Sequence, residues 1–269
     1  MNMKNCRNLL LAAAVLVAAS SCSDKVQVKG TLAGAPDTQV VVKQLSGSTL
    51  VTLDTLKTDA SGAYSCKIDV LKGQPQFVYL FKGDTKIASL LLQKGDKVKV
   101  ASDTLGKYSV EGSEESEKLR QVEEDFAAFI DKFSADAAAG DNAAASKDYI
   151  EYYRGCVKYI MTNSKSLTSI PVLYQKVNEN FPIFSQATDA ILFQNVHDSL
   201  MTVYPESKYL EALKKEAEKR FNIFNLSQRV QNARESSYPD LNLPSVDGTK
   251  VKLSEVASKA VLVYFWQAA

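Results

Sequence analysis

The sequence predicts an α+β protein with an antiparallel β-sandwich or barrel at its N-terminal end, followed by an antiparallel layer of helices. Short runs in which apolar and polar residues alternate, separated by turn residues, fill the chain up to about residue 112. Longer segments with apolar residues at three- and four-residue spacing come after them. The chain has 269 residues, which is enough for about two domains. Because 45% of the residues are hydrophobic, the composition excludes a disordered protein.

Eight short strands are expected in the β module, which spans residues 22–112. They are Val26–Leu32, Thr38–Gln44, Thr49–Leu56, Ala63–Val70, Gln76–Lys82, Lys86–Leu92, Lys97–Ala101 and Lys107–Val110. Regular spacing of this kind is typical of sandwiches and barrels. Asp59–Gly62 forms a turn, because Asp bonds its own backbone and Gly tolerates positive φ. Alternation within Ala63–Val70 places Cys66 on the face that points into the core.

Residues 113–226 are expected to form the helical layer. Ser113 is a suitable N-cap for a first helix that carries an apolar stripe and ends near Gly140. A second helix, from about Ala144 to Thr162, places Cys156 on its inner face. Further helices are expected over Ile170–Val177, Ala187–Val203 and Ser207–Phe224. The connections are short, which favours antiparallel packing.

The C-terminal part differs in pattern from the helical layer. Residues 227–238 are polar and are expected to form a linker or a continuation of the last helix. A new unit starts at Pro239, with a hairpin around an Asp247-Gly248 turn and then a helical turn capped by Ser254. The continuous apolar run Ala260–Trp266 is typical of a strand buried on both faces.

The N-terminal 21 residues have the three parts of a secretory signal peptide. Lys4 and Arg7 precede the apolar run Leu9–Ala19, and small residues lead to Cys22. The run is shorter than the ~20 residues that a membrane span needs. Small residues directly before a cysteine resemble the bacterial lipobox, which implies cleavage before Cys22 and lipidation of that residue. The alternative is ordinary cleavage near Ser21, which leaves a plain thiol.

Lipidation would anchor the protein to a membrane of the cell envelope. The segment Ser23–Lys25 contains a single acidic residue, so it lacks the strongly acidic stretch that resembles a surface-export signal in some lipoproteins. The periplasmic face and the cell surface both remain open.

Four stretches of the C-terminal part resemble the opening of a thioredoxin-like domain. They are Pro239–Leu243, Asp247-Gly248, Val251–Ser254 and Val261–Trp266. Such domains occur in envelope thiol-disulfide oxidoreductases and in the alkyl hydroperoxide reductase/thiol-specific antioxidant group. The resemblance implies a truncated α/β domain over residues 239–269. The preceding β and helical parts resemble the lipoprotein module, a domain of unknown function, that often precedes such a domain.

The resembled family carries a C-x-x-C pair shortly after its Phe-Trp. Here Phe265-Trp266 is followed by Gln267–Ala269, and Ala269 occupies the place of a tryptophan that comes before the first cysteine. Thiol-disulfide exchange needs a thiolate at a helix N-terminus and a resolving thiol one turn later. We therefore expect this chain to be inactive as an oxidoreductase and assign it no catalytic residue.

Other candidate groups have less specific patterns. Cys66 and Cys156 are either a redox pair or separate core thiols, and we expect the second. His197 is expected on a helix surface without a role, because no nucleophile or metal partner lies near it in sequence. The tyrosines of the second helix either line a sugar- or peptide-binding face or form a half-buried helix interface, and their spacing favours the interface. These are Tyr149, Tyr152, Tyr153 and Tyr159.

The charge balance and the cysteine spacing exclude several function classes. The chain has 32 basic and 31 acidic residues, which disfavours nucleic-acid binding. No cysteine or glycine spacing indicates a metal, nucleotide or other cofactor site. Two hypotheses remain. The first is a lipid-anchored envelope protein of the thioredoxin-like oxidoreductase lineage without its C-x-x-C segment. The second is a non-enzymatic envelope lipoprotein that binds a partner protein or a glycan.

Overall fold

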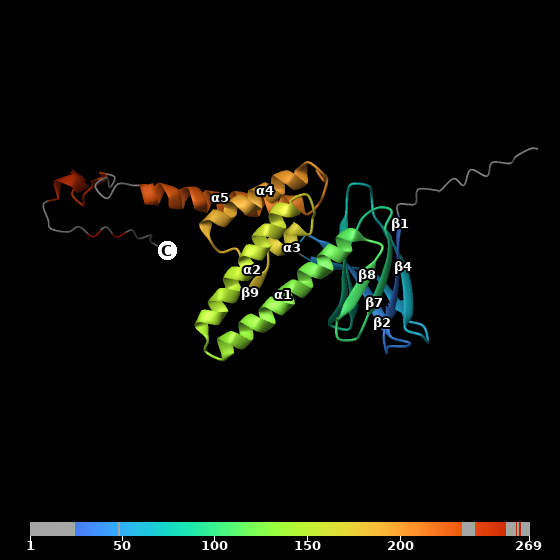
Figure 1. The fold of residues 1–269 in the computed structure, drawn as a ribbon. Coiled ribbons are helices and arrows are strands. Elements are labelled where there is room, and N and C mark those ends of the chain that lie inside the picture. The colour runs from blue at the N-terminus through green and yellow to red at the C-terminus, as the bar shows by residue number, and fades with distance from the viewer. Residues whose placement is uncertain (1–24, 48, 233–239, 257–261, 263, 265–269) are drawn as a thin grey trace, which may run out of the picture. The chain divides into compact units, whose positions relative to one another are not determined.

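The computed structural model describes residues 25–47, 49–232, 240–256, 262 and 264 (Figure 1). The chain divides into one unit that ends at Phe221 and a second that begins at Asn222. The expected signal peptide at 1–21, the expected lipidation site Cys22 and the end of the expected linker, 233–238, lie outside the described residues.

The β module contains all eight predicted strands. They are β1 (Lys25–Leu32), β2 (Gln39–Ser46), β3 (Thr49–Lys57), β4 (Ala63–Asp69), β5 (Gln76–Lys82), β6 (Thr85–Leu92), β7 (Lys97–Ser102) and β8 (Tyr108–Glu111). Strands β4-β1-β7-β8 form one four-stranded sheet, here sheet A, and strands β3-β2-β5-β6 form another, here sheet B. The described N-terminal part therefore has the two stacked sheets of a sandwich.

Sheet A corrects one detail of the prediction, because its two central strands are parallel. β1 pairs with β7 in the parallel direction, with Lys29 opposite Lys99, whereas the other pairs of both sheets are antiparallel. A tight hairpin can only join antiparallel strands, and a parallel pair needs a longer crossover. Here the chain leaves sheet A after β4, passes through β5 and β6 of sheet B, and returns to β7 beside β1.

The core of the β module lies between the two sheets. Every second residue of β1 and of β7 is buried, as the alternation predicts. Cys66 belongs to this core, so its predicted inward direction is confirmed. Gly30 has no side chain because the ring of Tyr64 occupies the space above it. A Cβ atom at Gly30 would lie 2.0 Å from Cζ of Tyr64.

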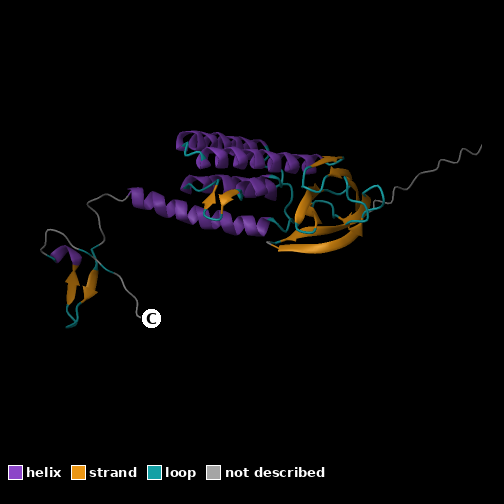
Figure 2. Ribbon diagram, turned by 90° about the horizontal axis from the view of Figure 1, so that it is seen from below, coloured by secondary structure: helices purple, strands orange, loops and turns teal. Residues whose placement is uncertain are grey.

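The helical layer follows the β module (Figures 1 and 2). It contains α1 (Glu114–Ala138), α2 (Asn142–Thr162), α3 (Ser169–Leu173), the short 3-10 helix η1 (Ala187–Asp189), α4 (Ala190–Met201) and α5 (Leu210–Asn232). The helix predicted over Ile170–Val177 ends at Leu173 and is followed by a small hairpin, β9 (Lys176–Asn178) with β10 (Phe181–Pro182). The Asn178 side chain accepts a hydrogen bond from the N–H of Asn180, which stabilises the turn. Helix α5 continues into the segment predicted as linker or helix tail and ends at Asn232.

The part of sheet B formed by β5 and β6 is largely buried on both faces because the helical layer packs against its outer side, whereas the edge strand β3 is mostly exposed. All residues of β6 from Ile87 to Leu92 are buried. Phe77 and Leu91 point away from the sandwich core and join a second core made by the helices. Cys156 lies in this second core, as predicted. Sheet A has no such cover among the described residues, and its outer positions are exposed.

Two serines at the start of α1 close the edge of sheet B. β6 is an edge strand, so the backbone groups on its outer side need partners. The Ser116 hydroxyl accepts from the N–H of Leu91 at 3.1 Å and is also 3.1 Å from the Leu91 carbonyl oxygen. Ser113, the N-cap of α1, donates to the same carbonyl at 3.3 Å. The start of α1 therefore bonds the backbone groups of Leu91 that a further strand of sheet B would otherwise bond.

Two further side chains join the module to the helices. Glu123 of α1 accepts hydrogen bonds from Lys86 at 2.6 Å, from Ser89 at 2.8 Å and from Tyr108 at 3.2 Å. Where the ladder between β2 and β5 ends, the Tyr209 hydroxyl accepts from the N–H of Phe77 and donates to the carbonyl of Leu45. Glu123 contacts β6 of sheet B and β8 of sheet A, and Tyr209 contacts β5 and β2 of sheet B, so the β module is held to both α1 and the start of α5.

The second unit contains the hairpin that the sequence predicts. β11 (Asn242–Pro244) pairs with β12 (Lys250–Lys252) across a turn in which Gly248 has a φ of 84°. A short 3-10 helix, η2 (Leu253–Glu255), follows, but Ser254 does not cap it. Instead, the Asp240 carboxylate accepts from the N–H of Ser254 at 2.9 Å.

The apolar run Ala260–Trp266 was expected to form a buried strand. Most of it lies outside the described residues. Its two described residues, Leu262 and Tyr264, are exposed and belong to no helix or strand. A buried strand is therefore not seen at these two positions.

We expect Ser116→Ala to lower the free energy of unfolding by about 1–3 kcal/mol, because the buried N–H of Leu91 loses its partner. Urea denaturation of a chain comprising residues 23–269 measures this change. Ser134→Ala is the matched control, since Ser134 lies on the exposed side of the same helix and should change stability by less than about 0.5 kcal/mol. Equal stabilities for the two variants would contradict the assigned role of Ser116.

Candidate functional site

The outer side of sheet A carries a polar surface, which we call the lysine face. Its members are Lys25, Gln27, Lys29 and Thr31 of β1, Ala63, Ser65, Lys67 and Asp69 of β4, Lys97, Lys99 and Ala101 of β7, and Ser109 and Glu111 of β8. These are the alternate positions that the sandwich core does not use. Their side chains are exposed, except that Ala63 is half-buried.

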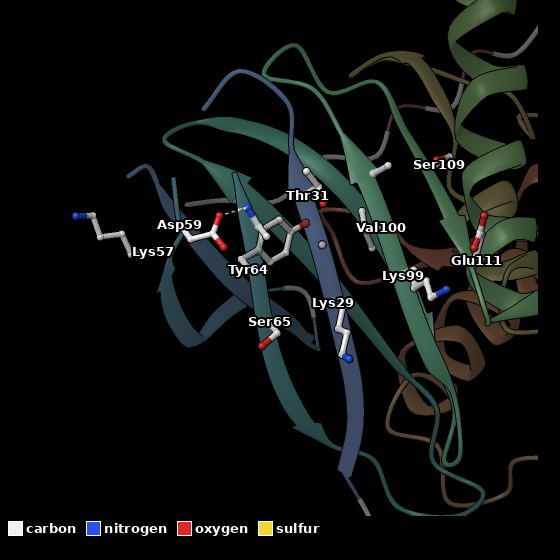
Figure 3. Close-up of a pocket in the computed structure, with 13 residues that line it drawn as sticks. Lys29, Thr31, Lys57, Asp59, Tyr64, Ser65, Lys99, Val100, Ser109 and Glu111 are labelled. Carbon is white, nitrogen blue, oxygen red and sulfur yellow. Dashed lines mark hydrogen bonds between the residues drawn. The ribbon is translucent and has the colours of Figure 1, made fainter. Parts of the chain in front are cut away.

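Strand register sorts these residues into rows across the sheet. Ala63, Thr31, Ala101 and Ser109 form a row of short side chains. Ser65, Lys29, Lys99 and Glu111 form the next row, which contains three long side chains. A hollow of about 780 Å³ lies over these two rows, with Lys57 and Asp59 at its rim (Figure 3). The hollow exists because short side chains lie beside long ones on a twisted sheet.

The lysine face carries an excess of positive charge. Lys29 lies directly opposite Lys99, and Lys67 and Lys97 lie on either side of Gln27. Asp69 is 3.9 Å from Lys25, and no ion pair within the described residues involves the other four lysines of the face. Like charges on directly opposite positions of a sheet repel each other. A ligand with negative charge would remove that repulsion.

The rim of the hollow is held by a turn that was predicted from the sequence. One carboxylate oxygen of Asp59 accepts from the hydroxyl of Ser61 at 2.6 Å and from the backbone N–H groups of Ser61 and Ala63. These bonds, above all that from the Ser61 hydroxyl, lower the pKa of the Asp59 carboxyl below its ordinary value. Asp59 therefore stays ionised at neutral pH and holds the turn, which does not suit a general acid. Gly62 has a φ of 81°, and a Cβ there would lie 2.3 Å from the Leu32 carbonyl oxygen.

The two described thiols are separated from the lysine face and from each other. Cys66 lies in the sandwich core and Cys156 in the helical core, and both are free. Burial raises the pKa of each thiol to about 11. The prediction of separate core thiols is confirmed, because the two cysteines are free and lie in different cores.

His197 is buried, which corrects its expected position on a helix surface. Only 11% of its side chain is exposed, and its Nδ1 atom is 3.0 Å from Oδ1 of Asp198. With Phe193, Val196 and Leu200 it follows the spacing of a buried helix face, which the sequence already contains. The buried face explains the position of His197, and no catalytic partner lies beside it among the described residues.

The tyrosines of α2 form the predicted helix interface. Each hydroxyl is bonded within the protein: Tyr149 to the carbonyl of Ile183, Tyr152 to Gln175, Tyr153 to Asp189 and Tyr159 to Thr168. The rings of Phe129 and Tyr152 stack with centroids 4.2 Å apart. The alternative, a sugar- or peptide-binding face, does not fit hydroxyls that are already bonded and half-buried.

Residues 26–119 match the family described as "Domain of unknown function (DUF4369)". The match extends over all eight strands of the β module and ends inside α1, so it includes both serines that close the edge of sheet B. The predicted module of unknown function is thus confirmed for the β-rich part of the chain. No curated protein matches the chain.

None of the helices in the described part of the chain is both long and apolar enough to cross a membrane. Within the same residues, no group of three or more histidine, cysteine or acidic side chains could hold a metal ion.

The lysine face was not predicted from the sequence. The signal for it is the alternation of lysine with core residues in β1, β4 and β7, which places the lysines on one side of each strand. That these sides adjoin follows only from the order β4-β1-β7-β8, which joins strands far apart in the sequence.

We expect Cys66 and Cys156 to resist thiol reagents in the folded protein. At pH 8 a thiol with a pKa of about 11 is only about 0.1% thiolate, and burial limits access as well. A chromogenic disulfide added to the folded 23–269 chain should produce almost no increase in absorbance. After denaturant is added, the increase in absorbance should correspond to two reacting thiols. Rapid reaction of either thiol without denaturant would contradict this assignment.

Proposed function

We propose that this chain is a lipid-anchored cell-envelope protein that acts as a binding protein through its lysine face. The observation that carries the proposal is the open polar hollow across all four strands of sheet A. Sheet B has the same number of strands, but its outer face is used to hold the helical layer. A polar face without cover on a rigid sheet is suited to recognition of a ligand or a partner.

The described side chains that could act as nucleophiles, acids or bases support binding rather than catalysis. Both described thiols are buried with raised pKa values, and the Asp59 carboxylate is used in its own turn. His197 lies in the helical layer, whereas the hollow lies on sheet A. A nucleophile, a base and a stabilising group that converge on one point are not found among the described residues.

The C-terminal part supports a relationship with thioredoxin-like oxidoreductases. The resemblance over residues 239–269 implies this lineage, and the hairpin of β11 and β12 forms where the resembled stretches lie. Thiol-disulfide exchange in this lineage uses a C-x-x-C pair, and residues 1–269 do not contain one. The partners are then the membrane, through the lipid anchor, and an envelope protein or glycan at the lysine face.

Occupancy of the lysine face in cells tests the binding function. Ser109→Cys introduces a thiol beside the hollow, and Ser134→Cys introduces a matched exposed thiol on α1. In the purified 23–269 chain both should react quickly with a maleimide, because both positions are exposed. In envelope fractions from cells that make the protein, a bound ligand should protect only the thiol at position 109 from the maleimide. If the face is occupied nine-tenths of the time, the labelling rate at position 109 should fall about tenfold.

The thiol at position 134 controls for crowding and for access of the reagent to the envelope. Equal labelling rates at both positions in the envelope fraction would show that the face is free there, and the proposed binding function would then be wrong.

We expect Cys22 to be lipidated, because charged, apolar and small residues precede it in the lipoprotein order. Acyl chains contribute about 0.8 kcal/mol per buried methylene, so two or three chains hold a protein firmly in a membrane. Wild type and Cys22→Ser, expressed in a Gram-negative host, should differ in detergent partitioning and in intact mass by the acyl groups. Equal partitioning of both into water without added mass would refute the anchor.

A further inference from the structure

We propose that the ligand of the lysine face is an acidic polysaccharide whose carboxylates bind between Lys29 and Lys99. This inference deepens the proposed binding function and rests on it. The two lysines lie in register on neighbouring strands at the edge of the hollow, and neither has an acidic partner among the described ion pairs (Figure 3). A carboxylate between them would gain two charge-assisted hydrogen bonds.

The spacing of the lysines favours a ligand with repeated negative charge. Lys67 and Lys97 belong to the row two residues along the strands from Lys29 and Lys99, a separation of about 7 Å. Neighbouring strands are about 4.8 Å apart, so the four ammonium groups cover a two-dimensional patch. A chain of acidic sugars presents carboxylates at regular intervals, and successive units would reach successive rows.

Three of the other side chains that line the hollow match sugar hydroxyls, beside the buried residues Tyr64 and Val100. Thr31, Ser65 and Ser109 each present a hydroxyl that can donate and accept. Ala63 and Ala101 lie in the same row as Thr31 and leave space above the sheet. A hydrated ligand with many hydroxyls fits a wide polar hollow of about 780 Å³ better than a compact apolar molecule does.

Other classes of ligand fit this face less well. Protein interfaces are anchored by buried aromatic or large apolar side chains, and the described residues of the lysine face are lysines, acids, one glutamine and small or short polar residues. Insertion into a membrane interface also needs apolar anchors. Bound single-stranded nucleic acid stacks on aromatic side chains, which the described positions of this face lack.

Binding of oligogalacturonate to the 23–269 chain tests the inference. We expect calorimetric binding that weakens as salt is added, and no binding of neutral dextran oligomers. Lys29→Gln combined with Lys99→Gln should weaken binding about tenfold or more. The control combines Lys165→Gln with Lys219→Gln. Both lysines are exposed in the helical region, so these substitutions remove the same amount of charge and should leave the affinity unchanged.

A second measurement uses the wild-type lysines. Oligogalacturonate should slow maleimide labelling of Ser109→Cys and leave labelling of Ser134→Cys unchanged. This places the bound sugar at the hollow even if the double lysine variant proves unstable.

Several results would overturn the inference. They are no binding of oligogalacturonate, equal loss of affinity in the control variant, no protection at position 109, or tighter binding of polyglutamate or of phosphatidylglycerol vesicles. Failure of this inference differs from failure of the proposed function. If position 109 is protected in the envelope but oligogalacturonate does not bind, the face has a ligand of another class. If position 109 is unprotected in the envelope, the binding function itself fails.

Discussion

The bonds between the start of α1 and the backbone of Leu91 are the contacts on which the arrangement of the first unit depends. An edge strand exposes N–H and C=O groups that must find partners, and Ser113 and Ser116 supply them where a fifth strand of sheet B would otherwise lie. Once these bonds fix the start of α1, the apolar stripe of that helix lies against the helical core that Leu91 joins. The family match extends just far enough into α1 to contain both serines, which agrees with the helix start being part of the β module.

Covering the β6 edge of sheet B and the outer side of β5 and β6 makes the two sheets unequal. Residues 87–92 of β6 are buried on both sides, whereas β1 and β7 in sheet A alternate between buried and exposed. A strand covered on both faces must be apolar throughout, and a strand with one free face is able to carry charge at every second position. The same packing that makes the helical layer possible therefore leaves sheet A with an outer face on which polar residues carry no structural penalty.

Much of the fold was predictable from local patterns, because its strands and helices obey them closely. The eight strands follow from alternation, the cap at Ser113 from residue type, and the inward direction of Cys66 and Cys156 from periodicity. The parallel pairing of β1 with β7 was not predictable, since it arises from a crossover through the other sheet. The burial of His197 was predictable from its spacing with Phe193 and Leu200, because the three residues share one face of α4. The lysine face needed the register of four strands, which no local pattern contains.

The distribution of charge over the first unit distinguishes the lysine face from the helical surfaces. On α1 and α5, basic residues lie one helical turn from acids and pair with them, as Lys118 does with Glu114 and Lys215 with Glu211. The chain as a whole is almost neutral, with 32 basic and 31 acidic residues. The excess of lysines on the outer side of sheet A is therefore balanced by acidic residues elsewhere in the chain. Exposed lysines repel each other only weakly in water, and the free face therefore costs the fold little. The pairing on the helices is a local property of their sequences, whereas the lysine rows arise only when β4, β1 and β7 come together. A surface whose charge is assembled by the fold, over a hollow that the packing leaves open, has the properties of a recognition site for an anion.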